Sequence, residues 1–350
     1  MALIAAEKQL ADAIANQQRI QGLIRQKETL ISHLSRSRGV GIRGVISRVQ
    51  IQQIGNEMRA LTVLCQQLTV AIADVQAKQA TVDALRVGSK GGLKRALLVG
   101  INYLNTPYQL AGCINDATNM QNQLKTFFPQ QSIEYRLLAD DRAEKPTKAA
   151  IMNGLQWLTT GLQPGDNVLF HFSGHGGRVR DTNGDEVTGL DSCIYPLNGS
   201  KIEIITDDEL RAALATTVPA GCKCLVVIDA CHSGSAVDLR YMWESPSQTS
   251  IAYKEETKYA KTAGAVLFLS GCRDEQVAAD TADKWGRPCG ALTMALLDVW
   301  KSYGPAIKTK YLLWDVRQYL KANRYSQIPC LSSGMYLDMN KVFDLGSPAI

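Results

Sequence analysis

Membrane spans, disulfide frameworks and nucleic-acid-binding surfaces each need a composition that this sequence lacks. No apolar run approaches the ~20 residues of a membrane-spanning helix, and the first apolar stretch ends at Glu7 and Lys8, unlike a signal peptide. Nine scattered cysteines, an odd number in 350 residues, do not form a disulfide framework. The net charge of +5 is too small for a nucleic-acid-binding surface. We expect a soluble protein of a reducing compartment, the cytoplasm, with no nucleic-acid partner and no membrane partner.

Proline is absent before Pro107, and residues 1–86 are predicted to be helical. Mostly apolar residues recur there at seven-residue spacing, in two series separated by a break. The first series is Leu3, Leu10, Gln17, Ile24 and Ile31, and the second is Leu61, Leu68, Val75 and Val82. Sustained heptads favour a helical hairpin or a coiled coil. We therefore expect residues 1–86 to form two antiparallel helices or an oligomerising stalk, and self-association is a candidate role for them.

A glycine-rich turn between the two series carries Gly39, Gly41 and Gly44 in the G-x-G-x-x-G spacing of dinucleotide-binding loops. That use of the spacing needs a strand before it and a helix after it, whereas a helix is predicted before it here. We therefore exclude nucleotide binding. A second glycine-containing segment, VGSKGGL at 87–93, is predicted to be a flexible linker between domains.

Strands and helices are predicted to alternate from residue 94 onward. The predicted strands are Lys94–Ile101, Ile133–Leu138, Asn167–Ser173, Cys224–Ala230 and Ala265–Gly271, with a last extended segment at Gln327–Ser332. The predicted helices are Cys113–Phe128, Thr147–Thr160, Asp207–Ala215, Ala291–Tyr303 and Leu312–Asn323. This order is typical of βαβ units, so we expect an α/β fold in which a mostly parallel sheet has helices on both faces.

Two of the apolar strands end in short polar segments that contain glycine. One segment, VVIDACHSGS, carries Cys231, and the other, VLFHFSGHGG, carries His175, 56 residues earlier. In open α/β sheets, ligands bind at the loops that follow the carboxyl ends of the strands. Two neighbouring parallel strands would bring this thiol and this imidazole together.

A thiol is a weak nucleophile until it loses its proton, so it needs a base beside it. Of the four histidines, His33 lies in the helical region, His171 lies inside an apolar strand, and His232 adjoins the cysteine, where consecutive side chains diverge. His175 is left as the base, and the backbone amides of Gly176 and of the cysteine are candidates for holding an oxyanion. Either residue alone is compatible with a structural role, but the pair at two strand ends predicts nucleophilic catalysis.

The segments SGHGG at 173–177 and DACHSG at 229–234 resemble the two signatures of metacaspases. These are caspase-like cysteine peptidases of plants, fungi, protists, bacteria and some viruses. For caspases, a histidine about 50 residues before the cysteine is a known spacing. The resemblance also includes LLVGINY, GCINDA, SGCRDEQVAAD and QIPCLSS, and it covers roughly residues 94–335.

The resemblance implies a caspase-like peptidase domain over residues 94–350. Its large-subunit part would span about 94–240, a linker about 241–262, and its small-subunit part about 263–350. The short linker is similar to that of type I metacaspases. The helical N-terminal region does not resemble the Pro-rich or zinc-finger prodomain that is common in type I members.

Metacaspases cleave after arginine or lysine, so the resemblance implies protein or peptide substrates with a basic residue at the P1 position. The acidic P1 pocket of the family maps onto Asp116 and Asp229, with Cys113 and Ser173 at supporting places. Carboxylates in a partly desolvated pocket bind a guanidinium through paired charge-assisted hydrogen bonds. Without the resemblance, Asp229 is also compatible with a loop cap and Asp116 with an acid in the first turn of a helix.

Many metacaspases need calcium, and the matching positions are Asp191, Asp207, Asp208 and Asp238. Calcium takes roughly six to eight oxygen ligands, so four acids from three loops are a candidate site, although Asp207 and Asp208 are also compatible with a helix start. Residues 181–192 begin like an EF-hand loop but lack its central glycine and its terminal glutamate. We therefore reject an EF-hand.

The sequence thus predicts a calcium-activated cysteine endopeptidase with Cys231 as nucleophile and His175 as general base and acid. The lysine-rich segment with Lys254, Lys258 and Lys261 is a candidate self-cleavage site, because it offers the enzyme its own preferred residue. Cys272 and Cys289 are rival thiols, and Cys272 is interpreted as structural. The alternative function is a catalytically weak caspase-like scaffold that oligomerises through its N-terminal helices and recruits partners.

Overall fold

A computed structural model describes residues 2–36, 48–86, 91–181, 189–231, 236–243, 252–271, 280–282 and 288–346. The chain forms two compact units, Met1–Ser89 and Lys90–Ile350. The glycine turn at 39–44, most of the EF-hand-like segment, His232 and Cys272 lie outside the described residues.

The N-terminal unit consists of two long helices, α1 (Ala2–Arg36) and α2 (Arg48–Arg86). They run antiparallel. Leu10 near the start of α1 packs with Val75 near the end of α2, whereas Lys27 late in α1 forms an ion pair with Glu57 early in α2. The two-helix arrangement expected from the heptads is therefore present, with Gln17 of the first series buried as well.

Helix α2 carries more apolar surface than its pairing with α1 buries. Val49, Val63 and Val70 are 74%, 52% and 71% exposed. The stretch Ile51–Val75 has 25 residues and a mean hydropathy of 1.2 with 11% of it buried, so by length and composition it could cross a membrane. The expectation from the sequence concerned uninterrupted apolar runs, whereas polar residues such as Arg59 interrupt this stretch. One helix of this kind is weak support for a membrane span.

The second unit is built on an eight-stranded sheet of order β11-β10-β15-β12-β9-β3-β1-β2. Five adjacent strands of this sheet are parallel. They are β2 (Glu134–Ala139), β1 (Gly92–Gly100), β3 (Asp166–Ser173), β9 (Lys223–Asp229) and β12 (Ala265–Ser270). The other three are antiparallel to their neighbours. They are β15 (Cys330–Ser333), β10 (Tyr241–Trp243) and β11 (Lys254–Glu255).

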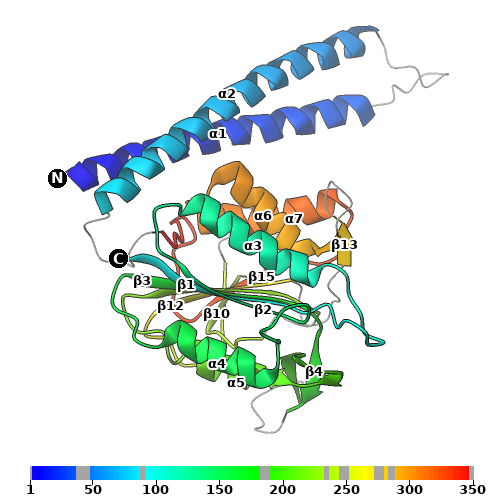
Figure 1. Ribbon diagram of the computed structural model, residues 1–350. Helices are drawn as coiled ribbons and strands as arrows, with labels where there is room; N and C mark the ends of the chain where they lie inside the picture. Colours follow the sequence, from blue (N-terminus) through cyan, green and yellow to red (C-terminus); the bar gives the residue numbers. More distant parts are fainter. Residues whose placement is uncertain are drawn as a thin grey trace. The chain divides into compact units, whose positions relative to one another are not determined.

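Helices cover both faces of this sheet (Figure 1). One face carries α3 (Cys113–Phe127), α6 (Ala291–Tyr303) and α7 (Thr309–Ala322), and the other carries α4 (Lys148–Thr159) and α5 (Asp207–Leu214). Successive residues of a strand point to opposite faces, so Leu169 belongs to the core under α3 and α6 and Phe170 to the core under α4 and α5. A strand that is buried on both faces reads as a continuous apolar run, which is why the fold class was predictable. The predicted α/β fold, in which a mostly parallel sheet has helices on both faces, is confirmed.

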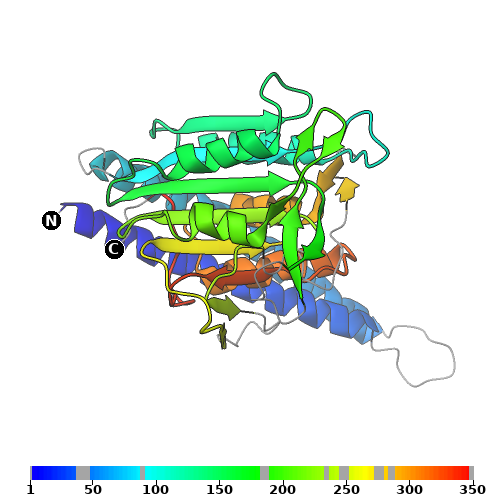
Figure 2. The ribbon, with the colours of Figure 1, turned by 90° about the horizontal axis from the view of Figure 1, so that it is seen from below.

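Smaller sheets extend the structure at the carboxyl ends of the parallel strands (Figure 2). A three-stranded sheet is made of β4 (Gly176–Arg180), β5 (Leu190–Ile194) and β8 (Ile205–Thr206). Two hairpins are made of β6 (Leu197–Asn198) with β7 (Lys201–Ile202), and β13 (Asp280–Ala282) with β14 (Pro288–Gly290). These strands were not predicted, because most are too short to show an alternating pattern.

Two predicted linkers prove to contain strands. β1 begins at Gly92 inside the 87–93 segment, where the Gly92 amide donates to the Gly165 carbonyl oxygen at 2.8 Å and Leu93 is buried. The 241–262 segment contains β10 and β11, which extend the sheet beyond β15. Burial of Tyr241 and Trp243 in the apolar core explains the pairing of β10. Two aromatic residues in a polar stretch gave too weak a pattern to predict it.

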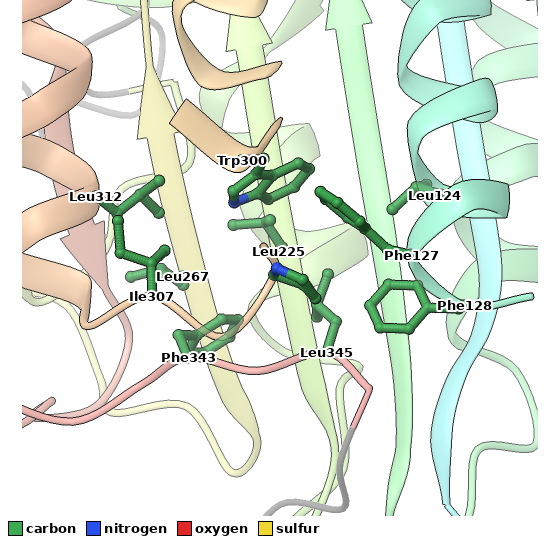
Figure 3. Close-up of a pocket in the computed structure, with 11 residues that line it drawn as sticks. Leu124, Phe127, Phe128, Leu225, Leu267, Trp300, Ile307, Leu312, Phe343 and Leu345 are labelled. Atoms are coloured by element: carbon green, nitrogen blue, oxygen red, sulfur yellow. The ribbon is translucent and has the colours of Figure 1, made fainter. Parts of the chain in front are cut away.

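A small apolar hollow lies near the amino ends of the parallel strands (Figure 3). It is lined by Leu124, Phe127, Phe128, Leu225, Leu267, Trp300, Pro305, Ile307, Leu312, Phe343 and Leu345. Leu225 and Leu267 lie early in β9 and β12, so the hollow is at the end of the sheet opposite Cys231. Its lining has no charged group, and we assign it to core packing.

Candidate active site

The strands β3 and β9 are parallel neighbours, so the predicted nucleophile and base, which follow their carboxyl ends, lie at the same end of the sheet. Ser173 and Asp229 are the last paired residues of the two strands. His175 and Cys231 each follow two residues after this pair. The Gly174 amide still donates to the Asp229 carbonyl oxygen, at 3.3 Å. The two strand ends therefore run side by side past the last paired residues.

Gly176 shows how closely the two strand ends approach. A Cβ atom on Gly176 would lie 2.3 Å from the carbonyl oxygen of Cys231 and 3.0 Å from the Cβ of Ala230. Any side chain would thus collide with the backbone of the cysteine, which is why glycine is needed at this close approach. Cys231 itself is half-buried and is a thiol rather than half of a disulfide.

Two tyrosines fix the position of His175. Its ring Nε2 lies 2.8 Å from the carbonyl oxygen of Tyr108, and its backbone amide donates to the hydroxyl of Tyr103 at 2.9 Å. The Tyr103 ring lies 4.6 Å from the imidazole, centroid to centroid. A carbonyl oxygen only accepts hydrogen bonds, so Nε2 carries the hydrogen and Nδ1 is left as the proton acceptor of the ring.

Tyr103 is held in an unusual conformation inside the loop between β1 and α3. Its φ is 52°, in the left-handed region that non-glycine residues seldom adopt. The Asp140 carboxylate stabilises this turn by accepting from the amides of Asn102 and Leu104, at 2.9 and 2.7 Å. The Tyr103 hydroxyl donates to the Tyr195 carbonyl oxygen at 2.7 Å. Burial raises the pKa of Tyr103 well above its usual value, so it remains a neutral donor.

The predicted acidic residues Asp116 and Asp229 are both buried at this end of the sheet, with 1% and 4% of their surface exposed. Ser173 donates to Asp116 Oδ2 at 2.7 Å. The start of α3, which carries Asp116, packs on the end of β1, because a Cβ on Gly100 would lie 2.3 Å from the carbonyl oxygen of Cys113. The four residues predicted for the P1 pocket are therefore all buried at the carboxyl ends of the central strands and in the adjoining first turn of α3.

Buried carboxylates are costly unless hydrogen-bond donors or cations compensate their charge. Backbone amides at the start of α6 supply two donors: the amide of the N-cap residue Gly290 donates to Asp116 Oδ2 at 2.8 Å, and the Thr293 amide donates to Asp229 Oδ2 at 2.7 Å. These donors were not predicted, since a backbone amide leaves no mark in the sequence. The acidic pair therefore lies at the strand end that leads to Cys231, with Asp229 two residues before it in the sequence.

A histidine that was predicted to take part in packing contacts the first turn of α6. His171 in β3 is fully buried, and its Nε2 lies 3.1 Å from the Thr293 hydroxyl oxygen. Burial lowers the pKa of His171 to about 3. The imidazole is therefore neutral at physiological pH.

The predicted calcium ligands gather at a second place, around the start of α5. Ligand oxygens of Asp191, Asp207 and Asp208 lie within 4.8 Å of one another. The pKa of Asp207 is raised to about 8, first by burial and then by the charge of Asp238, which makes Asp238 a near neighbour. The amides of Ser192 and Asp208 donate to the Asp207 carboxylate and oppose that shift.

A hard, oxygen-seeking cation such as Ca²⁺ compensates both the burial and the mutual repulsion of clustered carboxylates such as these. The donor set therefore fits calcium. Asp207 and Asp208 are the first two residues of α5, whose N-cap Thr206 forms a capping box with Glu209. Asp207 and Asp208 therefore both begin a helix and belong to the candidate metal site, so the two interpretations are compatible.

Asp238 has further contacts that were not predicted. Its φ is 47°, and its Oδ1 accepts a hydrogen bond of 2.7 Å from the Tyr259 hydroxyl. Arg211 of α5 donates to the Asp238 carbonyl oxygen at 2.6 Å, and its guanidinium lies 5.0 Å from the centre of the Tyr259 ring. The acidic cluster is thereby joined to the segment that follows β10.

Comparison with known proteins places these features in a family. The family model "Metacaspase, peptidase C14 domain" matches residues 94–240. The chain is similar to metacaspase-1 of Mycosarcoma maydis, 34% identical over 300 residues, which cover 73% of this chain and 74% of that protein. It is 32% identical to metacaspase-1 of Schizosaccharomyces pombe over 298 residues, which cover 71% and 69%.

Two solved structures are also similar to the chain. A Geobacter sulfurreducens protein superposes with a TM-score of 0.52 at 25% identity, covering 72% of this chain and 99% of that one. Caspase-1 of Spodoptera frugiperda gives a TM-score of 0.45 at 13% identity, covering 73% and 92%.

Proposed function

The chain belongs to the metacaspase family of cysteine peptidases, and on that premise we propose that it is an endopeptidase that cleaves after arginine or lysine. The observation that carries this proposal is the grouping of a thiol, an imidazole and two carboxylates at the carboxyl ends of β3 and β9. The Cys231 thiol follows β9, the oriented imidazole of His175 follows β3, and the buried acidic pair lies beside both.

The reaction begins with proton transfer from the Cys231 thiol to Nδ1 of His175. The hydrogen bond from Nε2 to the Tyr108 carbonyl fixes the ring and stabilises the imidazolium that forms. The thiolate sulfur then attacks the carbonyl carbon of the scissile peptide bond, and the carbonyl π electrons move to the oxygen. We assign the amides of Gly176 and Cys231 as donors to that oxyanion.

Collapse of the tetrahedral intermediate breaks the C–N bond. The imidazolium of His175 gives its proton to the leaving amine, which departs, and a thioester to Cys231 remains. A water molecule then gives a proton to the imidazole and attacks the thioester, which releases the carboxylic acid and restores the thiol. Each step uses groups that lie at the ends of β3 and β9.

Specificity for a basic P1 side chain rests on Asp116 and Asp229. A guanidinium offers five N–H donors in a planar fork that matches two carboxylates, whereas an acidic P1 side chain would meet charge of its own sign. Hydrolysis of a matched set of fluorogenic peptides ending in Arg, Lys, Asp or Leu tests this. We expect turnover of the Arg and Lys peptides and none by a Cys231→Ala variant. Preference for the Asp or Leu peptide would refute the assignment.

We further propose that the cluster of Asp191, Asp207, Asp208 and Asp238 binds calcium and that calcium activates the enzyme. The ion would compensate the burial and the repulsion from Asp238 that together raise the pKa of Asp207, and it would order the segment joined to Asp238 through Tyr259. Isothermal titration calorimetry of Cys231→Ala with CaCl₂ measures binding apart from activity. Equal heats for that protein and for Cys231→Ala/Asp191→Asn would refute the assignment.

Self-processing is proposed for the exposed segment that contains Lys258 and Lys261. Both lysines lie outside the strands and are exposed, whereas Lys254 is in β11, so the first two are the better substrates. Mass spectrometry after calcium addition should detect cleavage after Lys258 or Lys261 in the wild type and an intact Cys231→Ala chain. A wild-type chain that stays intact while it hydrolyses Arg peptides would contradict self-processing.

A scaffold role through self-association is the second candidate, and one observation favours it. The exposed residues Val49, Val63 and Val70 of α2 repeat at multiples of seven, which is the spacing by which helices pair. Light scattering of the full chain and of residues 90–350 compares the two masses. An oligomeric full chain that lacks peptide hydrolysis would favour the scaffold, and a monomeric full chain would exclude it.

A further inference from the structure

The first turn of α6 is held by acids from distant parts of the chain. The first amides of a helix have no acceptor within the helix, and the N-cap residue here is Gly290, which has no side chain to supply one. Asp116 accepts from the Gly290 amide and Asp229 accepts from the Thr293 amide. The two carboxylates of the proposed P1 pocket therefore act as the cap of α6.

Gly290 lies against both acids and shows that they are close together. A Cβ on this glycine would lie 2.4 Å from Oδ2 of Asp229 and 2.8 Å from Oδ2 of Asp116. One point so close to both atoms means that the two oxygens are no more than 5.2 Å apart. Two carboxylates that lie this close together can both accept hydrogen bonds from one planar guanidinium. The first turn of α6 and the residue before it contact both carboxylates, so the position of this turn influences their separation.

His171 contacts the first turn of α6 through Thr293. Its Nε2 is 3.1 Å from the Thr293 hydroxyl oxygen, and both side chains are 0% exposed. Nδ1 of His171 has no hydrogen-bond partner among the residues that the structure describes. We assign the hydrogen to Nε2, because this tautomer leaves a lone pair rather than an N–H group unsatisfied at Nδ1.

The ring is well suited to hold Thr293 without disturbing the acids. Full burial lowers its pKa to about 3, so it adds no positive charge that would compete with a basic substrate. The contact also joins the two parts of the peptidase unit. His171 and both acids lie before residue 241, whereas α6 lies after residue 262.

We propose that His171 is a positioning residue for substrate specificity. Its hydrogen bond to Thr293 holds the first turn of α6, and the amides of that turn hold Asp116 and Asp229 at the separation that accepts arginine. This proposal rests on the proposed cleavage after basic residues. It adds that arginine recognition depends on a buried pair that does not touch the substrate.

Steady-state kinetics with Arg and Lys peptides tests the proposal in the calcium-supplied full chain. The variants are Thr293→Val, which removes the hydroxyl and keeps the shape, and His171→Leu. Thr293→Ser keeps the hydroxyl, and Thr126→Val makes the same change at an exposed site on α3. The rate at which iodoacetamide alkylates Cys231 reports the nucleophile without use of the P1 pocket.

We expect Thr293→Val and His171→Leu to raise KM for the Arg peptide about 5- to 10-fold, the value of one hydrogen bond. KM for the Lys peptide should change less than about 3-fold, because an ammonium is a point charge that needs no fixed spacing. The values of kcat and the alkylation rate should stay within about twofold of wild type. Thr293→Ser should restore most of the wild-type KM, and Thr126→Val should match wild type.

Each contrary result has a separate meaning. Equal losses on Arg and Lys peptides, or a parallel fall in kcat and alkylation rate, would show a general structural role and overturn the proposal. An unchanged KM in Thr293→Val would overturn it as well, while the proposed function would stand if wild type prefers Arg. A wild type with no preference for basic P1 residues would overturn both.

Discussion

The buried imidazole of His171 should make the peptidase unit sensitive to acid. The pKa of this ring is about 3 in the folded protein because it is fully buried, and it is about 6.5 in an unfolded chain. Between these two values the unfolded state binds a proton that the folded state does not. Stability is therefore lost as pH falls below 6.5 and is recovered as pH rises.

The loss can be calculated from the two pKa values. Between pH 7 and pH 5, one such group lowers the free energy of unfolding by about 2 kcal/mol. With a urea m-value of about 3 kcal/mol/M, the midpoint of unfolding would fall by roughly 0.7 M. The variant His171→Gln does not titrate in this range, so it should lack this part of the pH dependence whatever its stability at pH 7.

Tryptophan fluorescence during urea unfolding measures the effect in the relevant unit. All five tryptophans lie after residue 89, so the signal reports the peptidase unit rather than the helical pair. A Cys231→Ala background prevents self-cleavage during the measurement. Equal shifts between pH 7 and pH 5 with and without His171→Gln would refute the reasoning, because the other titrating groups are common to both proteins.

Three further predictions concern the site. Tyr103→Phe removes the hydroxyl that accepts from the His175 amide, so kcat should fall about 10-fold with KM nearly unchanged; peptide hydrolysis measures both, and an unchanged kcat would contradict the role of the loop. Gly176→Ala places a methyl group 2.3 Å from the Cys231 carbonyl oxygen, so kcat/KM should fall at least about 100-fold, and wild-type kinetics would mean that the strand ends separate freely. The pKa of Asp207 is raised, so its carboxylate costs stability as pH rises from about 4 to about 8. Asp207→Asn should therefore raise the calcium-free melting temperature at pH 8 by roughly 4 °C or more and abolish the calcium response in the same thermal scan; a lower melting temperature would contradict the sign.

The predictable part of this protein is what side-chain patterns determine. Continuous apolar runs marked β3 and β9, and the polar residues after each run marked the strand ends where His175 and Cys231 lie side by side. Parallel pairing of those two strands is enough to bring the two residues together. The heptads of the first 86 residues likewise predicted two helices, because periodicity determines which face is buried.

The remaining part depends on groups that carry no side-chain pattern. The Tyr108 carbonyl that orients His175 and the Gly290 amide that holds Asp116 are main-chain atoms. Gly290 meets Asp116 across 174 residues of sequence, and only the folded chain makes that contact. Tyr103 sits in a left-handed turn of an irregular loop, for which the sequence offers no periodic signal.

The order of strands has a consequence for the fate of a nicked chain. β12 and β15 come from the part after Lys258, yet they lie between β9 and β10, which come from the part before it. After a cut following Lys258, strands β12 and β15 of the second fragment would still be hydrogen-bonded to strands β9 and β10 of the first fragment. Processed protein should therefore run as two bands under denaturing conditions and elute as one particle of unchanged size in native chromatography.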